Sequence, residues 1–276
     1  MQLVYQRFWH NAVTRLGSRE LLSITNYLDT QSEYRVVLEI GVNDLIIKNA
    51  VVECYRQNGE ASVEPRIIRP ALQGIQAYFG SGKQVKEVLG ADHRLVELVL
   101  ENIMAVIQAE AYFYEDRGFE TAESYDDFWD QNYQESCIYY SNLASIKKRF
   151  MQYIQPKHRT TQLFSRYRNV AVYILGTENQ QINCNFSDSF HEMALNLTCH
   201  GNEHQVLNVE GWMLRCPDQV CRQSLPNLQG LVGLSLTGAK EKQILTLSGG
   251  SQGCTHLGLM TVDAAKALQA AFTARK

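Results

Sequence analysis

Three segments of the second half of the chain have strand-like patterns, and in the later two hydrophobic and polar positions tend to alternate with a period of two. These are residues 170–175 (VAVYIL), 193–199 (MALNLTC) and 205–214 (QVLNVEGWML). Such alternation places the apolar side chains on one face of a strand, and turn residues such as GNE at 201–203 separate the segments. The pattern therefore predicts antiparallel hairpins.

The first half of the chain shows the same succession of patterns. Residues 34–40 (YRVVLEI) and 45–55 (LIIKNAVVECY) read as strands, with GVND as a turn between them. Residues 94–113 and 261–276 have helical spacing of their apolar positions. Each half therefore predicts strands first and helices afterwards, which is typical of the α+β class.

The two halves also match each other when the chain is shifted by 159 residues. Identical residues at this shift include the pairs Arg7 and Arg166, Gly17 and Gly176, and Asp29 and Asp188. A smaller shift aligns PALQGI at 70–75 with PNLQGL at 226–231, and a larger one aligns GADH at 90–93 with GCTH at 253–256. The period is far longer than that of a solenoid repeat, so we expect two tandem degenerate copies of one α+β domain.

The repeat sets the expected domain boundaries. Residues 1–117 form the N-terminal copy, which lacks most of the cysteines, and residues 159–276 form the C-terminal copy. Residues 118–158 are acidic and aromatic, and they predict a helical connector whose charges face solvent. Two copies in one chain would allow an internal pseudo-dimer.

Composition and charge narrow the classes of function. The chain has 276 residues, a net charge of −3 and 45% hydrophobic residues. This balance predicts no binding to nucleic acid or to an anionic membrane surface. Apolar runs fall short of the roughly 18 residues that span a bilayer, and the N-terminus does not resemble a secretory signal. We therefore expect a cytoplasmic protein.

The cysteines supply the candidate chemistry. The chain has seven, an odd number, and five of them follow residue 180. In a cytoplasmic protein, reduced or metal-bound thiols are expected in place of disulfides. Cys216 and Cys221 form one pair, and Cys254 and His256 form a second. Three thiolates and an imidazole suit zinc or an iron–sulfur cluster, so these four residues are the predicted metal ligands.

The repeat shows which of these residues belong to the second copy alone. Cys254 aligns with Ala91, whereas His256 aligns with His93. One explanation for a histidine that is present in both copies is that it has a structural role.

Two alternatives remain open. Buried cysteines often serve as small hydrophobic residues, and the protein would then be a metal-free interaction or scaffold protein with protein partners. Alternatively, Cys254 is the nucleophile of a thiol-dependent enzyme. The glycines that precede it and the helix that follows it would favour a thiolate, and His256 would act as the base. The sequence does not decide whether the protein is an enzyme.

The second copy resembles an uncharacterised bacterial domain family over residues 164–275. The resemblance is carried by the Cys216–Pro217 step, the LVGL at 231–234 and the Gly-Cys-Thr-His-Leu at 253–257. The order of strands, helices and a Cys/His pair is also similar to the iron–sulfur scaffold proteins of the IscU/NifU type. This second resemblance implies that Cys216 takes the place of the first scaffold cysteine and that Cys254 and His256 take the place of the last cysteine and its histidine.

Overall fold

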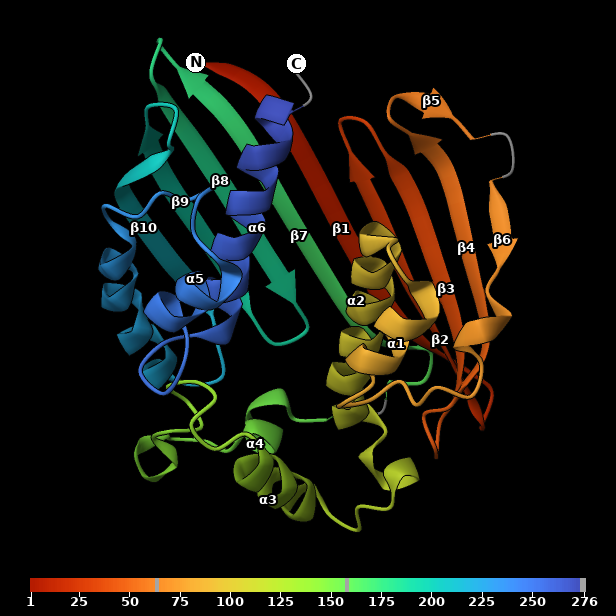
Figure 1. Cartoon of the computed structure of the whole chain (residues 1–276). Coiled ribbons are helices and arrows are strands. Elements are labelled where there is room, and N and C mark those ends of the chain that lie inside the picture. Colours follow the sequence, from red (N-terminus) through yellow and green to blue (C-terminus); the bar gives the residue numbers. More distant parts are fainter. Residues whose placement is uncertain (63–64, 157–158, 274–276) are drawn as a thin grey trace. The chain divides into compact units, whose positions relative to one another are not determined.

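A large antiparallel sheet dominates the computed structural model of the chain, which describes residues 1–62, 65–156 and 159–273 (Figure 1). The strands of the sheet are β1 (Gln2–Leu16), β2 (Glu20–Asp29), β3 (Glu33–Gly41), β4 (Ile47–Gln57), β5 (Glu60–Ala61), β6 (Arg66–Ile68), β7 (Gln162–Leu175), β8 (Asn179–Asp188), β9 (Glu192–His200) and β10 (Gln205–Arg215). Their order is β10-β9-β8-β7-β1-β2-β3-β4-β5, and β6 also pairs with β4.

Helices follow the strands in each half of the sequence. The α-helices are α1 (Gly82–Leu89), α2 (His93–Ala109), α3 (Ala122–Asn132), α4 (Phe150–Ile154), α5 (Glu241–Ser248) and α6 (Thr255–Thr273). The 3₁₀ segments are η1 (Pro70–Leu72), η2 (Glu110–Tyr112), η3 (Tyr114–Arg117), η4 (Leu143–Ser145) and η5 (Gln219–Leu231). The last three residues of the predicted helix 261–276 lie outside the described residues. No helix in the described part of the chain is long and apolar enough to cross a membrane.

The expected fold class is wrong in its architecture. The strands of both sequence halves belong to one ten-stranded sheet, and the structure does not divide clearly into two tandem α+β copies. A period-two pattern marks a strand and its buried face, but it does not specify which strand lies beside it.

The chain forms two compact units that interleave in sequence. Unit 1 contains Met1–Arg7, Asp126–Ile154 and Arg168–Lys276, and unit 2 contains Phe8–Tyr125 and Gln155–Tyr167. Strands β1 and β7 therefore each contribute residues to both units. The boundaries predicted at residues 117 and 158 stay predictions, and residue 158 itself lies outside the described part of the chain.

Alternating side chains explain how unit 2 buries its sheet. In β2, for example, Leu21, Ser23 and Thr25 are buried and alternate with half-buried residues. Helix α2 packs on β2 and β3, where Asn102 accepts a hydrogen bond from the Ser23 hydroxyl at 2.9 Å. The polar groups of Ser23 and Asn102 are thus hydrogen-bonded to each other inside the core.

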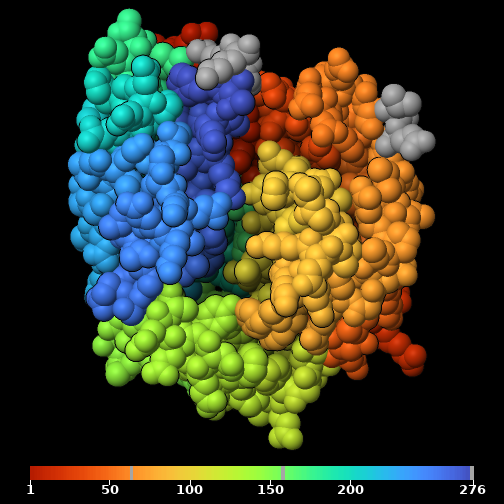
Figure 2. Space-filling view, in the orientation of Figure 1, coloured from red at the N-terminus to blue at the C-terminus, as the bar shows by residue number. Residues whose placement is uncertain are grey.

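Unit 1 has the same kind of layer, with α6 packed against β8 and β9 and α5 packed against α6 (Figure 1). Its hydrophobic core includes Leu195, Leu197, Leu257 and Leu268, all almost fully buried. Figure 2 shows residues of the green segment, which includes 126–154, directly below the blue helices of the C-terminal part.

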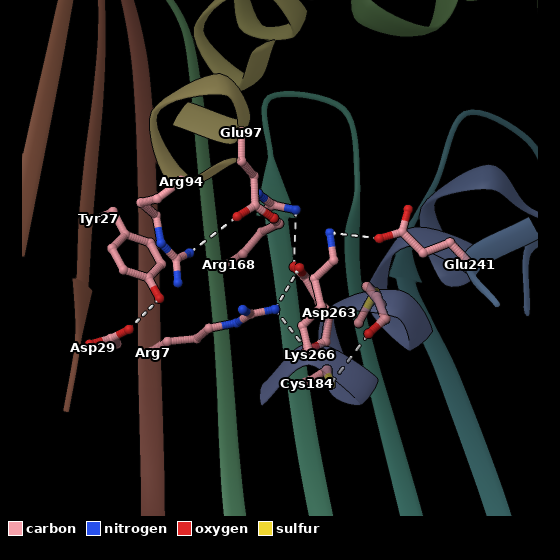
Figure 3. Close-up of polar contacts among 11 residues, drawn as sticks. Arg7, Tyr27, Asp29, Arg94, Glu97, Arg168, Cys184, Glu241, Asp263 and Lys266 are labelled. Carbon is pink, nitrogen blue, oxygen red and sulfur yellow. Dashed lines mark hydrogen bonds and ion pairs between the residues drawn. The ribbon is translucent and has the colours of Figure 1, made fainter. Parts of the chain in front are cut away.

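A buried ion cluster connects α6 with the two longest strands inside unit 1 (Figure 3). Asp263 accepts from Arg7 at 2.8 Å and from Arg168 at 3.0 Å. All three side chains are less than a tenth exposed, so water screens these charges weakly. The cluster fixes the position of α6, and with it the position of the residues at the start of this helix.

Candidate metal site and neighbouring thiols

The predicted ligand His256 lies in the first turn of α6, where it contacts a second histidine. Its ring centroid is 4.3 Å from that of His191 and 5.1 Å from that of Phe186, which comes from β8. His191 lies in the turn between β8 and β9. The packing of α6 on β8 therefore brings together two imidazoles that are 65 residues apart in the sequence, as the difference 256 − 191 shows.

Asp188 holds the turn that carries His191. One of its carboxylate oxygens accepts from the backbone amides of Phe190 at 2.8 Å and His191 at 2.6 Å. The same oxygen lies 3.1 Å from Nδ1 of His191. The Asp188 side chain is fully buried, and that of His191 is 13% exposed.

Asp188, His191 and His256 together form a candidate metal site. Each offers one ligand atom, and these atoms all lie within 4.8 Å of one another. Within the described residues, this is the group of three histidine, cysteine or acidic side chains that comes close enough to hold one ion. Two histidines and a carboxylate are ligands that suit zinc, iron and related divalent ions.

The β2–β3 hairpin of unit 2 has the same turn without the histidine. Asp29 accepts from the amides of Gln31 at 2.8 Å and Ser32 at 2.6 Å, in the way that Asp188 does. Ser32 thus occupies the place that His191 has in unit 1. The aspartate is required by the turn in both hairpins, whereas the imidazole is specific to unit 1.

Asp188 and His191 are not among the metal ligands predicted from the sequence. The sequence identifies Asp188 only as a residue that both halves of the chain share. The available signal was the Asp-x-x-His spacing in this turn, set against Asp-x-x-Ser in the other half. This spacing points to a metal site only when the fold is known, because α6 places His256 beside His191.

Cys216 and Cys221 lie together next to this turn. Arg215 donates to the carbonyl oxygens of Asp188 at 2.6 Å and His191 at 3.0 Å, which ties the end of β10 to the turn. Cys216 is the next residue, and its thiol donates to the carbonyl oxygen of Asp218 at 3.2 Å. Metal binding by Cys216 and Cys221 stays a prediction.

The two thiols of this pair differ in acidity. The hydrogen bond from Cys221 lowers the pKa of Cys216 to about 7, and the charge of Arg222 also favours the thiolate, while burial opposes it. The same hydrogen bond and burial raise the pKa of Cys221 far above its ordinary value. Cys216 is half-buried, whereas Cys221 is buried.

Cys254 lies in a closed turn between α5 and α6. Its amide donates to the carbonyl oxygen of Ser248 at 2.9 Å, and a side chain on Gly253 would collide with the carbonyl groups of Ser248 and Gly249. Close backbone packing therefore requires this glycine. Burial raises the pKa of Cys254 to about 12, so its thiol stays protonated near neutral pH and is poorly placed for nucleophilic chemistry.

A further thiol reaches the same region from the segment 118–158. Ile138 donates its amide to the carbonyl oxygen of Gly253 at 2.9 Å, and the Thr255 hydroxyl donates to the carbonyl oxygen of Ser136 at 3.1 Å. These bonds place Cys137 beside the turn of Cys254. Cys137 is not among the predicted ligands, because residues 118–158 were expected to form a connector.

The four predicted ligands are therefore divided among three places in unit 1. His256 belongs to the group with Asp188 and His191, and Cys216 and Cys221 form the adjacent thiol pair. Cys254 is enclosed in the α5–α6 turn. The prediction that the three cysteines bind metal stays a prediction.

Comparisons with known proteins place one part of the chain in a family. Neither the curated proteins nor the solved structures include a match to this chain. The expectation of an uncharacterised domain family is confirmed by a family model that covers most of the C-terminal half. Residues 154–269 match the model of a family described as protein of unknown function (DUF2889).

Proposed function

We propose that unit 1 binds a divalent transition metal ion through Asp188, His191 and His256. The observation that carries this proposal is the convergence of one carboxylate and two imidazoles within 4.8 Å, from a turn and a helix start that are distant in sequence. Imidazole binds zinc, iron, nickel and copper well, and a carboxylate supplies the negative charge that such an ion favours.

The number of ligands determines what kind of metal site this is. Structural zinc sites normally have four protein ligands, whereas three protein ligands leave a coordination position for water or substrate. Zinc bonds of roughly 2.0–2.2 Å place neighbouring ligand atoms about 3.4 Å apart, so small rotations of the imidazoles complete the site. The proposed site is therefore open, and its bound water is the group that would carry any chemistry.

Metal binding by the cysteines is a separate prediction, which the same experiments test. Zinc or iron–sulfur binding through Cys216, Cys221, Cys254 and His256 stays a prediction, as does the resemblance to iron–sulfur scaffold proteins. The cytoplasmic location also stays a prediction. An ion bound by Asp188, His191 and His256 has nitrogen and oxygen ligands, whereas an ion bound by the cysteines has sulfur ligands, and spectroscopy separates the two.

Cobalt titration tests the proposal. The full chain is reduced, stripped of metal with a chelator and titrated with Co²⁺ while the visible and near-ultraviolet absorption is recorded. We expect saturable binding of one ion with d–d bands and without a thiolate-to-cobalt charge-transfer band. A strong charge-transfer band would move the site to the cysteines, and lack of binding would favour a metal-free interaction protein.

Variants locate the site. His191→Ser reproduces the Asp-x-x-Ser turn of Asp29 and Ser32, so it should fold and lose cobalt binding at least tenfold. His200→Ser is the matched control, because His200 is an exposed histidine of unit 1 that is bonded to Asn179 and does not belong to the group. Equal affinity of the His191→Ser variant and the wild type would refute the site.

A further inference from the structure

One face of the sheet in unit 1 is turned away from the helices. Helix α6 packs on the opposite face of β8 and β9, where Ile182, Leu195 and Leu197 are buried (Figure 1). Successive side chains of a strand point to opposite faces, so the residues between these core positions face solvent. The central part of this solvent face, the amide face, consists of Gln181, Asn183, Asn185, Ala194, Asn196, Thr198, Asn208, Glu210 and Trp212.

The strand register arranges these side chains in rows across β8, β9 and β10. One row ends on Trp212, whose partner in β9 is Ala194, and Ala194 in turn pairs with Asn185 in β8. The amide face is therefore a set of hydrogen-bonding groups beside an aromatic ring that is 45% exposed. The two neighbouring rows, read from β8 to β10, are Asn183, Asn196, Glu210 and Gln181, Thr198, Asn208.

Hydrogen bonds between the amides hold them in place. Nε2 of Gln181 donates to Oδ1 of Asn183 at 3.2 Å and to Oδ1 of Asn196 at 3.4 Å. Each amide carries two N–H donors and a carbonyl oxygen that accepts twice, so these contacts use only part of its capacity. Side chains that are fixed before a ligand arrives lose less entropy on binding, so the amide face is organised in advance.

The equivalent face of unit 2 has different chemistry. At the shift of 159 residues, Asn183 and Asn196 correspond to Ile24 and Val37, which pair with each other in the sheet. Isoleucine and valine are enriched in strands, whereas asparagine is depleted. The asparagines of unit 1 are therefore unfavourable for the strands that carry them, and a role in binding accounts for their presence.

Trp212 also differs from its counterpart in unit 2. The same shift aligns it with Glu53, which forms an ion pair with Arg35 at 3.5 Å. In unit 1 the arginine is replaced by the small residue Ala194. An exposed indole offers a flat apolar surface with an N–H group at its edge, and both suit a ligand that has apolar and polar sides.

Charge decides which class of ligand fits the amide face. Glu210 is the charged residue of this face, and Glu192 is exposed at the start of β9. A nucleic acid needs lysine and arginine against its phosphates, and an anionic polysaccharide would likewise be repelled by the two glutamates. A neutral ligand rich in hydroxyl groups avoids this repulsion, and each hydroxyl both donates and accepts, as the amides do.

We propose that the amide face of unit 1 binds a neutral oligosaccharide. The apolar side of one sugar ring stacks on Trp212, and hydroxyl groups of other rings bond to Asn185 and Asn196. Adjacent strands lie roughly 4.8 Å apart, so the row from Asn185 to Trp212 spans about 10 Å. A chain of sugar rings covers this distance, whereas a single sugar does not. Binding requires no ion, so it is independent of the proposed metal site.

Affinity electrophoresis tests the proposal with the full chain. Native gels that contain a chelator are cast with starch, xylan, galactomannan, laminarin or a soluble cellulose derivative, and the retardation of the protein is compared with that in a plain gel. We expect at least one of these neutral polysaccharides to retard the wild type. Calorimetric titration with the hexasaccharide of the same linkage then gives the affinity, which Trp212→Ala should weaken at least tenfold.

Two further variants separate binding from folding. Asn196→Val introduces the valine that unit 2 has at this position, so it should fold and weaken binding at least fivefold. Tyr55→Ala is the matched control, because Tyr55 is an aromatic residue of unit 2 with a similar exposure of 42%, and it should bind like the wild type.

Three results would overturn the proposal. The first is that none of the neutral polysaccharides retards the wild type. The second is that Trp212→Ala and Asn196→Val both keep the affinity of the wild type. The third is that single-stranded RNA or heparin binds at physiological salt and competes with the neutral glycan for Trp212, since the amide face would then be a site for an anionic polymer.

Discussion

The cysteines of unit 1 differ mainly in how far each thiol is removed from water. Burial raises the pKa of Cys254 and Cys199 to about 12, because a thiolate is costly in an apolar environment. Cys184 is also fully enclosed, and its thiol donates to the carbonyl oxygen of Met260 at 3.7 Å. Cys216 alone among these receives a thiol hydrogen bond that favours its charged form.

Alkylation measures this difference directly. With a small excess of iodoacetamide near pH 7, we expect Cys216 to be modified at least tenfold faster than Cys184, Cys199 or Cys254, because only the thiolate reacts at a useful rate. Peptide mapping after short exposure identifies the modified residue. Faster modification of Cys254 would restore it as the candidate nucleophile.

Asp126 is the acidic residue whose burial has the clearest consequence for stability. Burial raises its pKa to about 6, against the lowering effects of the Met151 amide and Arg149. Arg149 lies 3.6 Å from Asp126 and also pairs with Asp127 at 2.8 Å and Asp130 at 2.6 Å. The carboxyl group is therefore held more readily in its protonated form in the folded protein than in the unfolded chain.

The pH dependence of stability follows from this shift. A raised folded pKa adds stability below about pH 4, and this contribution is lost as the pH rises through about 6. Relative to Asp126→Asn, the wild type should lose on the order of 2 kcal/mol of unfolding free energy between those limits. Urea unfolding at several pH values measures it. The exposed Asp127→Asn variant is the control. The account is contradicted if the difference in unfolding free energy between the wild type and Asp126→Asn does not change with pH.

At the scale of elements, α6 is held by charge as well as by apolar packing. Asp263 faces Arg7 and Arg168 inside unit 1, and removal of the shared carboxylate leaves two buried guanidinium groups beside each other (Figure 3). Breaking a buried ion pair by removing one partner is strongly destabilising.

We therefore expect Asp263→Asn to lower the free energy of unfolding by about 3–5 kcal/mol. The pair of Lys266 in α6 with Glu241 in α5, at 2.9 Å, is the control, because both side chains are more than a third exposed. Glu241→Gln should cost less than about 1 kcal/mol. If chemical denaturation shows the same loss of unfolding free energy for both variants, Asp263 stabilises the protein no more than an exposed ion pair does.

Individual elements were largely predictable from the sequence. The period-two segments at 193–199 and 205–214 lie within β9 and β10, and the helical spacing after residue 261 lies within α6. The helix expected after Cys254 begins at Thr255, ahead of the periodic pattern that starts at residue 261. Local patterns of hydrophobic residues show which face of a helix or strand is buried. They do not show how the turns between these elements are arranged.

The site was predictable only in part for the same reason. His256 was selected for its neighbour Cys254, but the structure pairs it with His191 across a turn. The adjacency of Cys216 and Cys221 followed from their short separation. Tertiary packing decides which distant turn faces the start of α6. A pattern in a single sequence does not show this contact.

At the scale of the whole molecule, the compact units do not follow the order of the chain. The core of unit 1 includes Tyr5 from β1 as well as Ile138 and Tyr139 from the segment before β7. Arg7, which binds Asp263, also comes from β1. This packing could not be predicted from the sequence, because a repeat indicates similar segments and does not show where each segment packs.

A truncated chain tests this interleaving. A fragment of residues 154–276 contains the matched family region but lacks Tyr5, Arg7, Ile138 and Tyr139. We expect it to show no cooperative thermal transition by near-ultraviolet circular dichroism, whereas the full chain unfolds cooperatively. A sharp transition of the fragment near that of the full chain would instead support an independent C-terminal domain.

The central claim is that Asp188, His191 and His256 bind one metal ion, and an X-ray structure of the zinc-loaded protein tests it most directly. Data collected at the zinc absorption edge locate the ion independently of any assumption about its ligands. We predict one anomalous peak within roughly 2.0–2.2 Å of a carboxylate oxygen of Asp188 and a ring nitrogen of each histidine. A peak among the thiols of Cys216, Cys221 and Cys254, or no peak in unit 1, would contradict the account.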